Sequence, residues 1–420
     1  MKYKAWLVTI IVFLAGVLFA AGNFKVPPTM VAVLGEMKVS IIMGGWLMSS
    51  SALAGIVLAL PAGGIMSKIG PKKLGLFALF CALIGNIVGA LAANFMMLMV
   101  GRLIEGIGFG LIGVVAPAII ALCFPAEKRG LPMAIWSVWV GTGMLLIFSA
   151  TNVIMPLFSW RGVWWFVAIL AAIMLVLFAG GVQVPVQVAK AESVVLKQET
   201  AALKPDLPYE GFKSPASWLL SLIFLMFGFG VGAMLTFAPT FMVEEVGMDV
   251  VNANMNTSVM TFGMISGGIL MGFVLNKVKN RSLLLIVSMA LSAIFMGLTF
   301  EVTSPNLILP FMLIMGLTYS MVPAVIFTIS PEAAVSPATV GITMGIIVLG
   351  QNLSGFIGPV FIGAIVERGG GAWSAATLPF VVAGIIGVIA SVLYGLVMKQ
   401  RASDQSSQLS GLLNKKTGAA

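Results

Sequence analysis

The chain has 420 residues, of which 60% are hydrophobic and 9% charged, with a mean hydropathy of +1.11 and a formal net charge of +9. Soluble domains carry about 25% charged residues, so this composition excludes a soluble globular protein and indicates a polytopic membrane protein. Two cysteines make no disulfide framework, and without histidine there is no histidine metal site or proton relay. We therefore expect no cofactor and no metal.

Twelve apolar segments, separated by charges, glycine or proline, are each long enough to cross a bilayer as a helix, which needs about 20 apolar residues. Six precede a polar stretch and six follow it. The predicted spans are 5–34, 40–66, 74–93, 95–123, 131–157 and 163–184, then 215–242, 254–275, 282–302, 306–330, 337–366 and 375–398.

This pattern predicts an all-α membrane protein with twelve transmembrane helices in two pseudo-symmetric six-helix bundles. The linker between the bundles has mixed charge, and the Ser- and Gln-rich end of the chain predicts disorder. The expected domains are an N-terminal bundle (1–184), a cytoplasmic linker (185–213), a C-terminal bundle (214–400) and a cytoplasmic tail (401–420).

The placement of basic residues predicts the orientation in the membrane. With the N-terminus inside, 18 of the 23 lysines and arginines fall in cytoplasmic segments, and five remain for the outer loops and the membrane interior. Topology therefore explains the positive excess, and no nucleic-acid partner is needed. We expect a multi-pass monomer of the cytoplasmic (inner) membrane, with both termini cytoplasmic and the lipid bilayer as its surroundings.

The two halves of the sequence repeat each other. Residues 25–30 (KVPPTM) resemble 236–241 (TFAPTF), and 63–72 resemble 272–281. Parallel six-helix repeats are a transporter architecture, in which the substrate binds near the midplane between the halves.

Arg102 and Glu105 lie inside the fourth apolar segment, where a charged residue costs about 2.5–3.5 kcal/mol to insert. Such residues face a protein interior or a water-filled cavity and often mark a transport pathway. Three residues apart on one helical face, the two side chains can also simply neutralise each other. Both interpretations can hold together, and we favour the cavity role.

Lys25 stands about twenty residues into the first span, which places it most of the way across the bilayer. Snorkelling to the outer surface explains such a lysine as well as a substrate role does. Asymmetry favours the substrate role: Thr236 replaces Lys25 in the second half, and the positions that match Arg102 and Glu105 are apolar. A charge needed only for folding is expected in both copies, whereas a binding charge need occur only once.

Lys25 and Arg102 against Glu105 predict a cavity of net positive charge, which favours a small anion. A lysine supplies a point charge and an arginine a planar fork suited to carboxylate oxygens. Glu105 is the one carboxylate that we place at membrane depth, so it is the candidate proton-coupling residue. Whether burial or the neighbouring arginine controls its protonation stays open.

Uncharged polar residues of the second half are further candidates for binding the substrate. Hydrogen bonding between helices is the simpler explanation for Tyr319 or Asn352 taken alone. The candidates are Thr236, Tyr319, Gln351 and Asn352.

Aromatic residues could line the same pocket, although packing and interface anchoring are the commoner roles of membrane tryptophans. The candidates are Trp46, Trp136 and Trp139. Three acids at the predicted outer mouth are expected to be solvated and count against anion entry: Glu244, Glu245 and Asp249.

These residues and repeats resemble the major facilitator superfamily over nearly the whole chain. The most specific match is the helix-four motif, Arg102 followed by Glu105-Gly106-Ile107-Gly108. The resemblance implies the two-bundle fold of the family and a transport activity.

The resemblance is weaker at the loop motif between the second and third helices, at 63–72. Lys68 takes the basic position, but Ser67 replaces the family's acid, and in the second copy Asn276 and Lys277 occupy these places. A charged latch at this loop is therefore in doubt. Arg129 resembles a residue of the family's charged loop between helices four and five, although a positive-inside anchor is the better explanation. The gating candidates are Lys68, Arg129 and Lys277.

Two further motifs concern the direction of transport and the branch of the superfamily. Gly141-Thr142-Gly143 resembles a fifth-helix motif associated with exporters, but the expected Gly-Pro after it is absent, which favours uptake. Residues 23–28 (NFKVPP) resemble a signature of the cyanate and nitroimidazole permease branch, with lysine in place of arginine. Organic anion porters of the superfamily fit equally well.

The sequence therefore predicts a secondary active transporter that takes up a small organic anion, such as a carboxylate, with protons by alternating access. A drug or metabolite exporter, or an anion exchanger, on the same fold is the alternative. With no P-loop, histidine cluster or Gly-x-Ser-x-Gly elbow, the sequence does not favour an enzyme.

Overall fold

A computed structural model describes residues 2–59, 65–66, 68–125, 128, 130–183, 211–278, 280–336 and 339–417. All regular structure in these ranges is helical, because a chain inside a bilayer has to satisfy its backbone hydrogen bonds internally. Most of the predicted linker, 185–210, lies outside the described residues.

The described helices of the two halves follow each other along the chain as the hydropathy pattern predicts. Those of the first half are α1 (Lys2–Phe24), α2 (Val26–Met37), α3 (Ile41–Ala59), α5 (Pro71–Ala90), α6 (Phe95–Cys123), α7 (Gly130–Ser137) and α8 (Trp139–Gly181). Those of the second half are α11 (Pro215–Glu244), α12 (Val250–Lys277), α13 (Arg281–Leu298), α14 (Pro305–Tyr319), α15 (Met321–Ala333), α16 (Val340–Arg368), the short 3-10 helix η3 (Trp373–Ala376) and α17 (Thr377–Thr417).

Eleven helical stretches of the described chain are long and apolar enough to span a membrane. One of them, Leu131–Gly181, has 51 residues, more than two bilayer thicknesses at about 1.5 Å per residue. It is broken at Phe158 and Ser159, where Ser159 has a φ of 55° and a ψ of −174°. This stretch therefore makes two passes, and the prediction of twelve spans is confirmed.

Two boundaries differ from the sequence-based expectation. The first predicted span is divided in two, because α1 ends at Phe24 and α2 begins at Val26. The Ser- and Gln-rich tail was expected to be disordered, but α17 continues to Thr417. Hydropathy indicates neither difference, because both depend on where the hydrogen bonds of a helix are interrupted or continue.

Small residues let the helices of the first half approach closely, as is usual in membrane bundles. At the crossing of α5 and α6, a Cβ added to Gly85 would lie 2.7 Å from the carbonyl oxygen of Gly101, and one on Gly101 would lie 2.8 Å from that of Gly85. Neither residue can therefore be larger. The crossing brings Asn86 of α5 and Glu105 of α6 to the same level.

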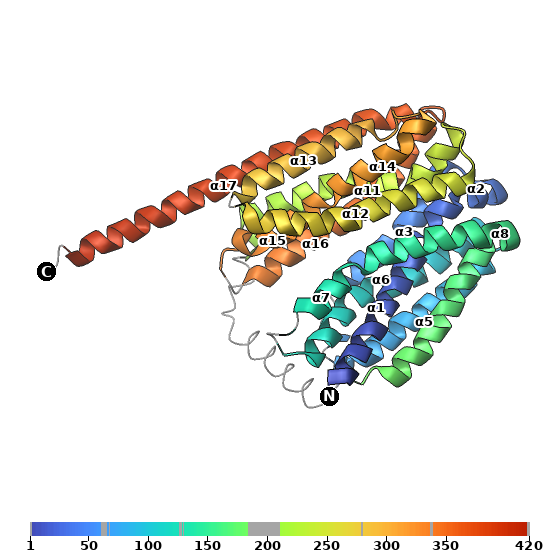
Figure 1. Cartoon of the computed structure of the whole chain (residues 1–420), viewed down its shortest axis with the longest axis horizontal. Coiled ribbons are helices and arrows are strands. Elements are labelled where there is room, and N and C mark those ends of the chain that lie inside the picture. Colours follow the sequence, from blue (N-terminus) through green and yellow to red (C-terminus); the bar gives the residue numbers. More distant parts are fainter. Residues whose placement is uncertain are drawn as a thin grey trace.

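The two halves meet along a seam that is formed mainly by α3 with α16 and by α8 with α12. A Cβ on Gly45 of α3 would lie 2.5 Å from the carbonyl oxygen of Pro359 in α16. Glu367 Oε2 accepts a hydrogen bond from the amide of Ile42 at 3.2 Å. In Figure 1 the helices of the two halves converge near α2 and diverge toward the N-terminus. The domain boundaries themselves stay a prediction.

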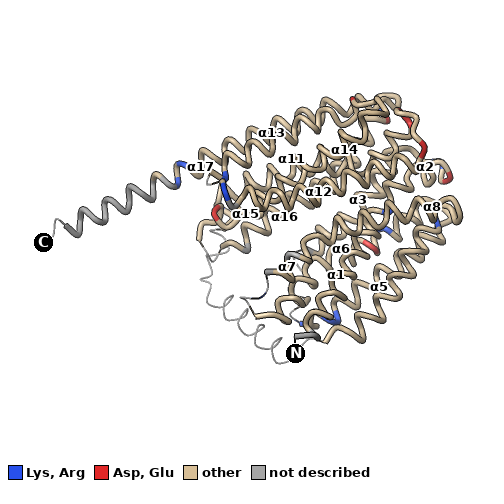
Figure 2. The backbone as a smooth tube through the Cα atoms, in the orientation of Figure 1, with Lys and Arg blue, Asp and Glu red and all other residues tan. Residues whose placement is uncertain are grey.

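Charged residues gather at the two ends of the helices, as expected for a protein in a bilayer (Figure 2). A small group of both signs lies in the interior beside α6. Its members are Lys25, Arg102 and Glu105, all of which are buried.

Candidate functional site

The interior charge group begins at the break between α1 and α2. Pro27 and Pro28 follow the break directly, and neither has an N–H with which to continue the helical hydrogen bonds. Pro27 in particular leaves the carbonyl of Asn23 without its helical donor. The last turn of α1 therefore presents free carbonyl oxygens inside the membrane, where each needs another partner.

Arg102 of α6 supplies those partners. Its Nη1 donates to the carbonyl oxygen of Gly22 at 2.9 Å, and its Nη2 donates to that of Asn23 at 3.2 Å. Nε donates to the carbonyl oxygen of Leu47 in α3 at 3.1 Å. A cation at the carbonyl end of a helix is also favoured by the helix dipole. Arg102 therefore acts as the cap of α1 and connects that helix to α3 and α6.

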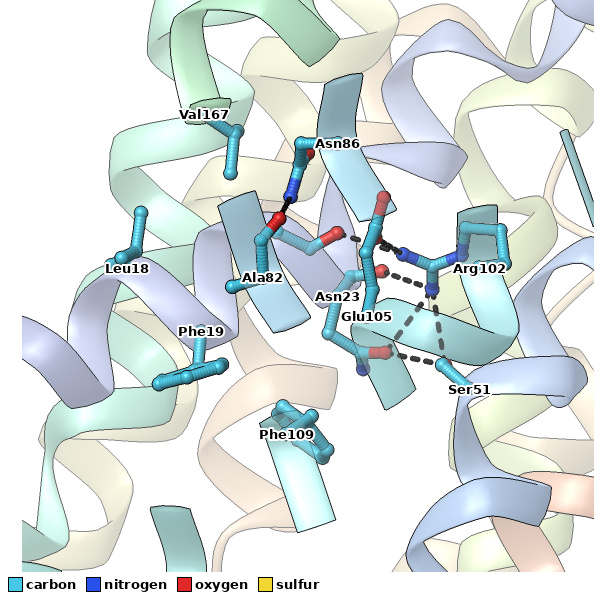
Figure 3. Close-up of a pocket in the computed structure, with 11 residues that line it drawn as sticks. Leu18, Phe19, Asn23, Ser51, Ala82, Asn86, Arg102, Glu105, Phe109 and Val167 are labelled. Carbon is cyan, nitrogen blue, oxygen red and sulfur yellow. Dashed lines mark hydrogen bonds and ion pairs between the residues drawn. The ribbon is translucent and has the colours of Figure 1, made fainter. Parts of the chain in front are cut away.

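The remaining contacts of Arg102 are with side chains (Figure 3). Nη1 lies 2.5 Å from Glu105 Oε2, and Nη2 lies 3.0 Å from Ser51 Oγ and 3.2 Å from Asn23 Oδ1. The hydroxyl of Ser51 in turn donates to Asn23 Oδ1 at 2.6 Å. All five N–H groups of an arginine are thus occupied within the protein.

Lys25 sits at the helix break itself and contacts the same carboxylate oxygen. Its Nζ is 2.5 Å from Glu105 Oε2, 2.8 Å from Asn86 Oδ1 and 3.2 Å from the carbonyl oxygen of Gly22. These three acceptors match the three donors of an ammonium group. The ring of Trp164 in α8 lies 4.7 Å from Nζ, close enough for a cation–π interaction.

The cluster of Lys25, Arg102 and Glu105 carries one surplus positive charge if all three groups are ionised. Glu105 Oε2 is shared by both cations, whereas the buried Oε1 has no hydrogen-bond partner among the described residues. The free space beside the cluster is about 10 Å³, enough for about one water molecule. No carboxylate substrate fits there in this conformation.

The asymmetry between the two halves therefore has a structural explanation. In the second half, α11 continues unbroken from Pro215 to Glu244 through its single Pro239. Thr236, the repeat mate of Lys25, donates to the carbonyl oxygen of Gly232 within the same helix. An unbroken helix needs no cationic cap, so a folding role for the charges does not require them to recur.

None of the second-half candidates lines the pocket beside the charge cluster. Thr236 and Tyr319 are fully buried, and Tyr319 packs edge-on against Phe227. Gln351 in α16 is exposed and Asn352 is partly buried. The structure therefore does not assemble these four residues into one pocket with Lys25 and Arg102.

Gln351 is the one exposed residue among these four candidates. One turn after it, Ser354 packs against Gly228 of α11, and Gly355 accepts a hydrogen bond from Ser49 of α3. Because residues three and four apart share a helix face, Gln351 is directed between α11 and α3. It therefore points to the region between the two halves.

The predicted gating residues form no network among the described residues. Lys68 and Lys277 are exposed and form no ion pair with another described residue, and Arg129 lies outside the described residues. The corresponding end of the second half instead holds an ion pair between Arg281 and Glu332, with Nη1 2.5 Å from Oε1. A gating role for the three candidates stays a prediction.

The tryptophan candidates have packing roles in this structure. Trp136 and Trp139 stack on each other with ring centroids 4.9 Å apart, and Trp136 fills the space above Gly16. Trp46 is partly exposed and contacts Phe356 edge-on.

Two of the acids at the predicted outer mouth have local partners. Glu244 accepts a hydrogen bond from Trp373 Nε1 at 3.3 Å. Asp249 caps α12 by accepting from the amide of Asn252 at 2.9 Å, and this bond holds the pKa of the Asp249 carboxyl below its usual value. These contacts account for both acids without a role in substrate entry.

Sequence reasoning missed the polar residues that complete the cluster: Asn23, Ser51 and Asn86. A usable signal was present for Asn86, because it lies in an otherwise apolar predicted span, where an amide needs a partner. Asn23 carried the same signal in the first predicted span, whereas Ser51 did not, since serines are common at helix contacts in membranes.

Comparison with known proteins identifies the group to which the chain is similar. The family model of the major facilitator superfamily matches residues 12–334 and 220–415. A D-xylose transporter of Levilactobacillus brevis is 27% identical over 173 residues, 41% of this chain and 37% of the relative. Myo-inositol transporter 2 of Schizosaccharomyces pombe is 29% identical over 147 residues, 34% of this chain and 26% of the relative. The matches span about a quarter to two fifths of these curated relatives.

Solved structures match over nearly their full length. A D-xylose-proton symporter has a TM-score of 0.73 at 19% identity, with 93% of this chain and 97% of that chain covered. A bacterial homologue of the human lysosomal transporter Spinster, in an inward-facing and unoccupied conformation, has a TM-score of 0.72 at 17% identity, with coverages of 96% and 99%. At these identities the likeness establishes the fold alone.

Proposed function

The chain belongs to the major facilitator superfamily, and from this premise we propose that it is a secondary transporter that works by alternating access. We propose further that it takes up a small organic anion, such as a carboxylate, together with protons. The single observation that carries this proposal is the surplus positive charge of the buried Lys25, Arg102 and Glu105 cluster.

The surplus charge acts on an anion without touching it. At an effective dielectric constant of about 20, one unit charge attracts an anion about 8 Å away by about 2 kcal/mol. A proton gained or lost by the cluster changes its net charge by one unit, and therefore changes this attraction. Proton movement and anion affinity are coupled in this way.

Contact with the substrate is assigned to the region between the halves. Lys25 and Arg102 are enclosed, so their role is to set the charge, while Gln351 and Asn352 supply hydrogen bonds to the bound anion. Thr236 and Tyr319, which are buried in helix contacts, support the second half. Glu105 is the proposed proton-coupling residue, and its unpaired Oε1 supports that assignment.

A neutral sugar or polyol is the second candidate substrate. Two relatives are named as transporters of D-xylose and myo-inositol, and all five N–H groups of Arg102 are used inside the protein. Because these donors are already used within the protein, the cluster is compatible with a substrate that carries no charge.

A flux assay in proteoliposomes separates the candidates. Purified protein is reconstituted, and mono- and dicarboxylates, D-xylose, myo-inositol and a lipophilic cation are each tested with and without an inwardly directed proton gradient. Proton-driven uptake of one carboxylate, weakened by Gln351→Ala, supports the anion proposal. Proton-driven sugar uptake favours the second candidate. Counterflow of anions that ignores the proton gradient indicates an exchanger, and efflux of the cation indicates an exporter.

We also propose that the chain is a monomer with both termini cytoplasmic and that the arrangement described is inward-facing. The seam contacts lie at the end of the helices away from the N-terminus, at Ile42–Glu367 and Gly45–Pro359. Single cysteines at Lys38 and Lys277 should react with an impermeant maleimide from the outer and the inner side of the membrane, respectively. The reverse pattern would refute the orientation.

A further inference from the structure

An apolar groove of about 320 Å³ runs along the seam between the halves. One wall is Trp46 of α3, and the other is a face of α16. Its lining includes Trp46, Phe356, Val360, Phe361, Ala364 and Arg368. Apart from Arg368, these residues are all apolar.

The groove opens away from the region between the halves. Val360 lies nine residues after Gln351, which turns it by about 180° around α16. Gln351 is directed between α11 and α3, so Val360 and its groove neighbours are directed outward. Because α3 and α16 belong to predicted membrane spans, the outward side of this seam faces the acyl chains of the bilayer.

The length of the groove matches one leaflet. Phe356 and Arg368 are twelve residues apart in a continuous helix, a distance of about 18 Å. Half of the hydrocarbon core is about 15 Å thick. Arg368 is the last residue of α16 and lies at the level where lipid headgroups begin, whereas Phe356 and Trp46 lie near the middle of the bilayer.

Arg368 supplies a charge at the end of the groove. It is exposed and forms no ion pair or hydrogen bond with another described residue. The neighbouring carboxylate, Glu367, is engaged by the amide of Ile42. An apolar channel of one-leaflet length with a free guanidinium at its headgroup end is complementary to a phospholipid, since arginine binds phosphate through its planar fork.

We propose that the groove between α3 and α16 is a binding site for one anionic phospholipid, with an acyl chain along Phe356, Val360 and Ala364 and the phosphate on Arg368. The lipid bridges the two halves, because Trp46 belongs to the first and the α16 residues to the second. It therefore stabilises the arrangement in which the seam is closed at Gly45 and Pro359.

Quenching of Trp46 by brominated lipid tests the site directly. The full chain is reconstituted in phosphatidylcholine with increasing fractions of phosphatidylglycerol that carries brominated acyl chains. The Trp46 signal is obtained by subtracting the Trp46→Phe variant. Trp165, which is exposed on membrane-spanning α8, gives the matched control for ordinary lipid contact through Trp165→Phe. We expect half-maximal quenching of Trp46 at an about fivefold lower phosphatidylglycerol fraction than that of Trp165.

Two variants separate the contribution of the Arg368 charge to lipid binding from that of the apolar channel. Arg368→Gln is expected to bring the Trp46 curve onto that of Trp165, and Arg368→Lys to keep most of the preference. Ala364→Phe fills the channel without changing any charge and should abolish the preference of Trp46 for phosphatidylglycerol. This second variant tests the proposal even if Arg368→Gln folds poorly. Identical curves for Trp46 and Trp165 in the natural sequence, or a preference that survives both Arg368→Gln and Ala364→Phe, would overturn the proposal.

Discussion

Arg102 Nη1 lies 2.9 Å from the carbonyl oxygen of Gly22, although the two residues are 80 positions apart in the chain. The contact lies at the end of α1, where the same guanidinium also serves the carbonyl of Asn23, which has no helical donor because Pro27 lacks an N–H. An arginine buried in a membrane helix is thus explained by backbone chemistry in a different helix. Arg102 therefore stabilises the fold in addition to contributing its charge to the cluster.

We expect Arg102→Ala to destabilise the protein by at least about 3 kcal/mol, because it leaves several buried acceptors without donors at about 1–3 kcal/mol each. Arg102→Lys should recover little, since one ammonium cannot reach carbonyls on both α1 and α3. Thermal unfolding in detergent gives the measurement. A variant that is as stable as the natural protein but inactive would instead support a direct contact between Arg102 and the substrate.

Glu105→Gln removes the one anion shared by two buried cations. The substitution should cost about 3–5 kcal/mol, which is typical when a buried ion pair loses one partner. Denaturant unfolding or thermal stability measures the effect. Glu245→Gln is the control, because Glu245 is exposed and its change should stay within about 0.5 kcal/mol. Equal stabilities of the two variants would contradict the charge assignment of the cluster.

Lys25→Met should be tolerated better than Glu105→Gln. It leaves Arg102 and Glu105 as a neutral pair and deprives Asn86 Oδ1 of its donor, at a cost of about 1–3 kcal/mol. The same change removes the surplus positive charge. If transport depends on that charge, anion uptake should fall by tenfold or more (about 1.4 kcal/mol or more) while sugar uptake by the same sample stays unaffected. If Lys25→Met is instead less stable than Glu105→Gln, the surplus positive charge does not destabilise the folded protein.

Gly45→Ala should loosen the seam between the halves. The added Cβ would lie 2.5 Å from a backbone oxygen of α16, which cannot move aside as a flexible side chain could. We expect the distance between spin labels at Lys38 and Arg368 to increase and broaden. Gly113→Ala is the matched control, since a Cβ there meets nothing within 4 Å. Unchanged label distances in Gly45→Ala would indicate that the seam is already mobile at this level.

The spans were predictable from sequence because hydropathy alone decides which segments enter a bilayer. The predicted boundary near 158–162 coincides with the break at Phe158 and Ser159, and the repeats gave the division into halves. The break at Lys25 was not recognised, although Pro27 and Pro28 were visible, because proline is tolerated in many membrane helices when neighbours satisfy the freed carbonyls. Only a structure identifies those neighbours.

The charges of the candidate site were found from sequence, but their partners were not. A lysine and an arginine in apolar spans stand out by composition, and Glu105 is three residues from Arg102. The pairing of Lys25 with Glu105 depends on how α1 packs against α6, and the two helices approach closely where Gly108 of α6 lies against Phe19 of α1. The inference from asymmetry compared charges without comparing the helix breaks that they serve, and the substrate role that it favoured stays a prediction.

The proline pair and Arg102 depend on each other, because the arginine donates to a carbonyl oxygen that Pro27 leaves without a helical donor. If Pro27 and Pro28 were lost first, the helical hydrogen bonds of α1 would close, and Arg102 would be a buried cation without those acceptors. If Arg102 were lost first, carbonyl oxygens without donors would remain in the membrane interior. Substitutions at the two places are therefore expected to be strongly epistatic. Mixed descendants, with one part kept and the other replaced, should be rare among related chains.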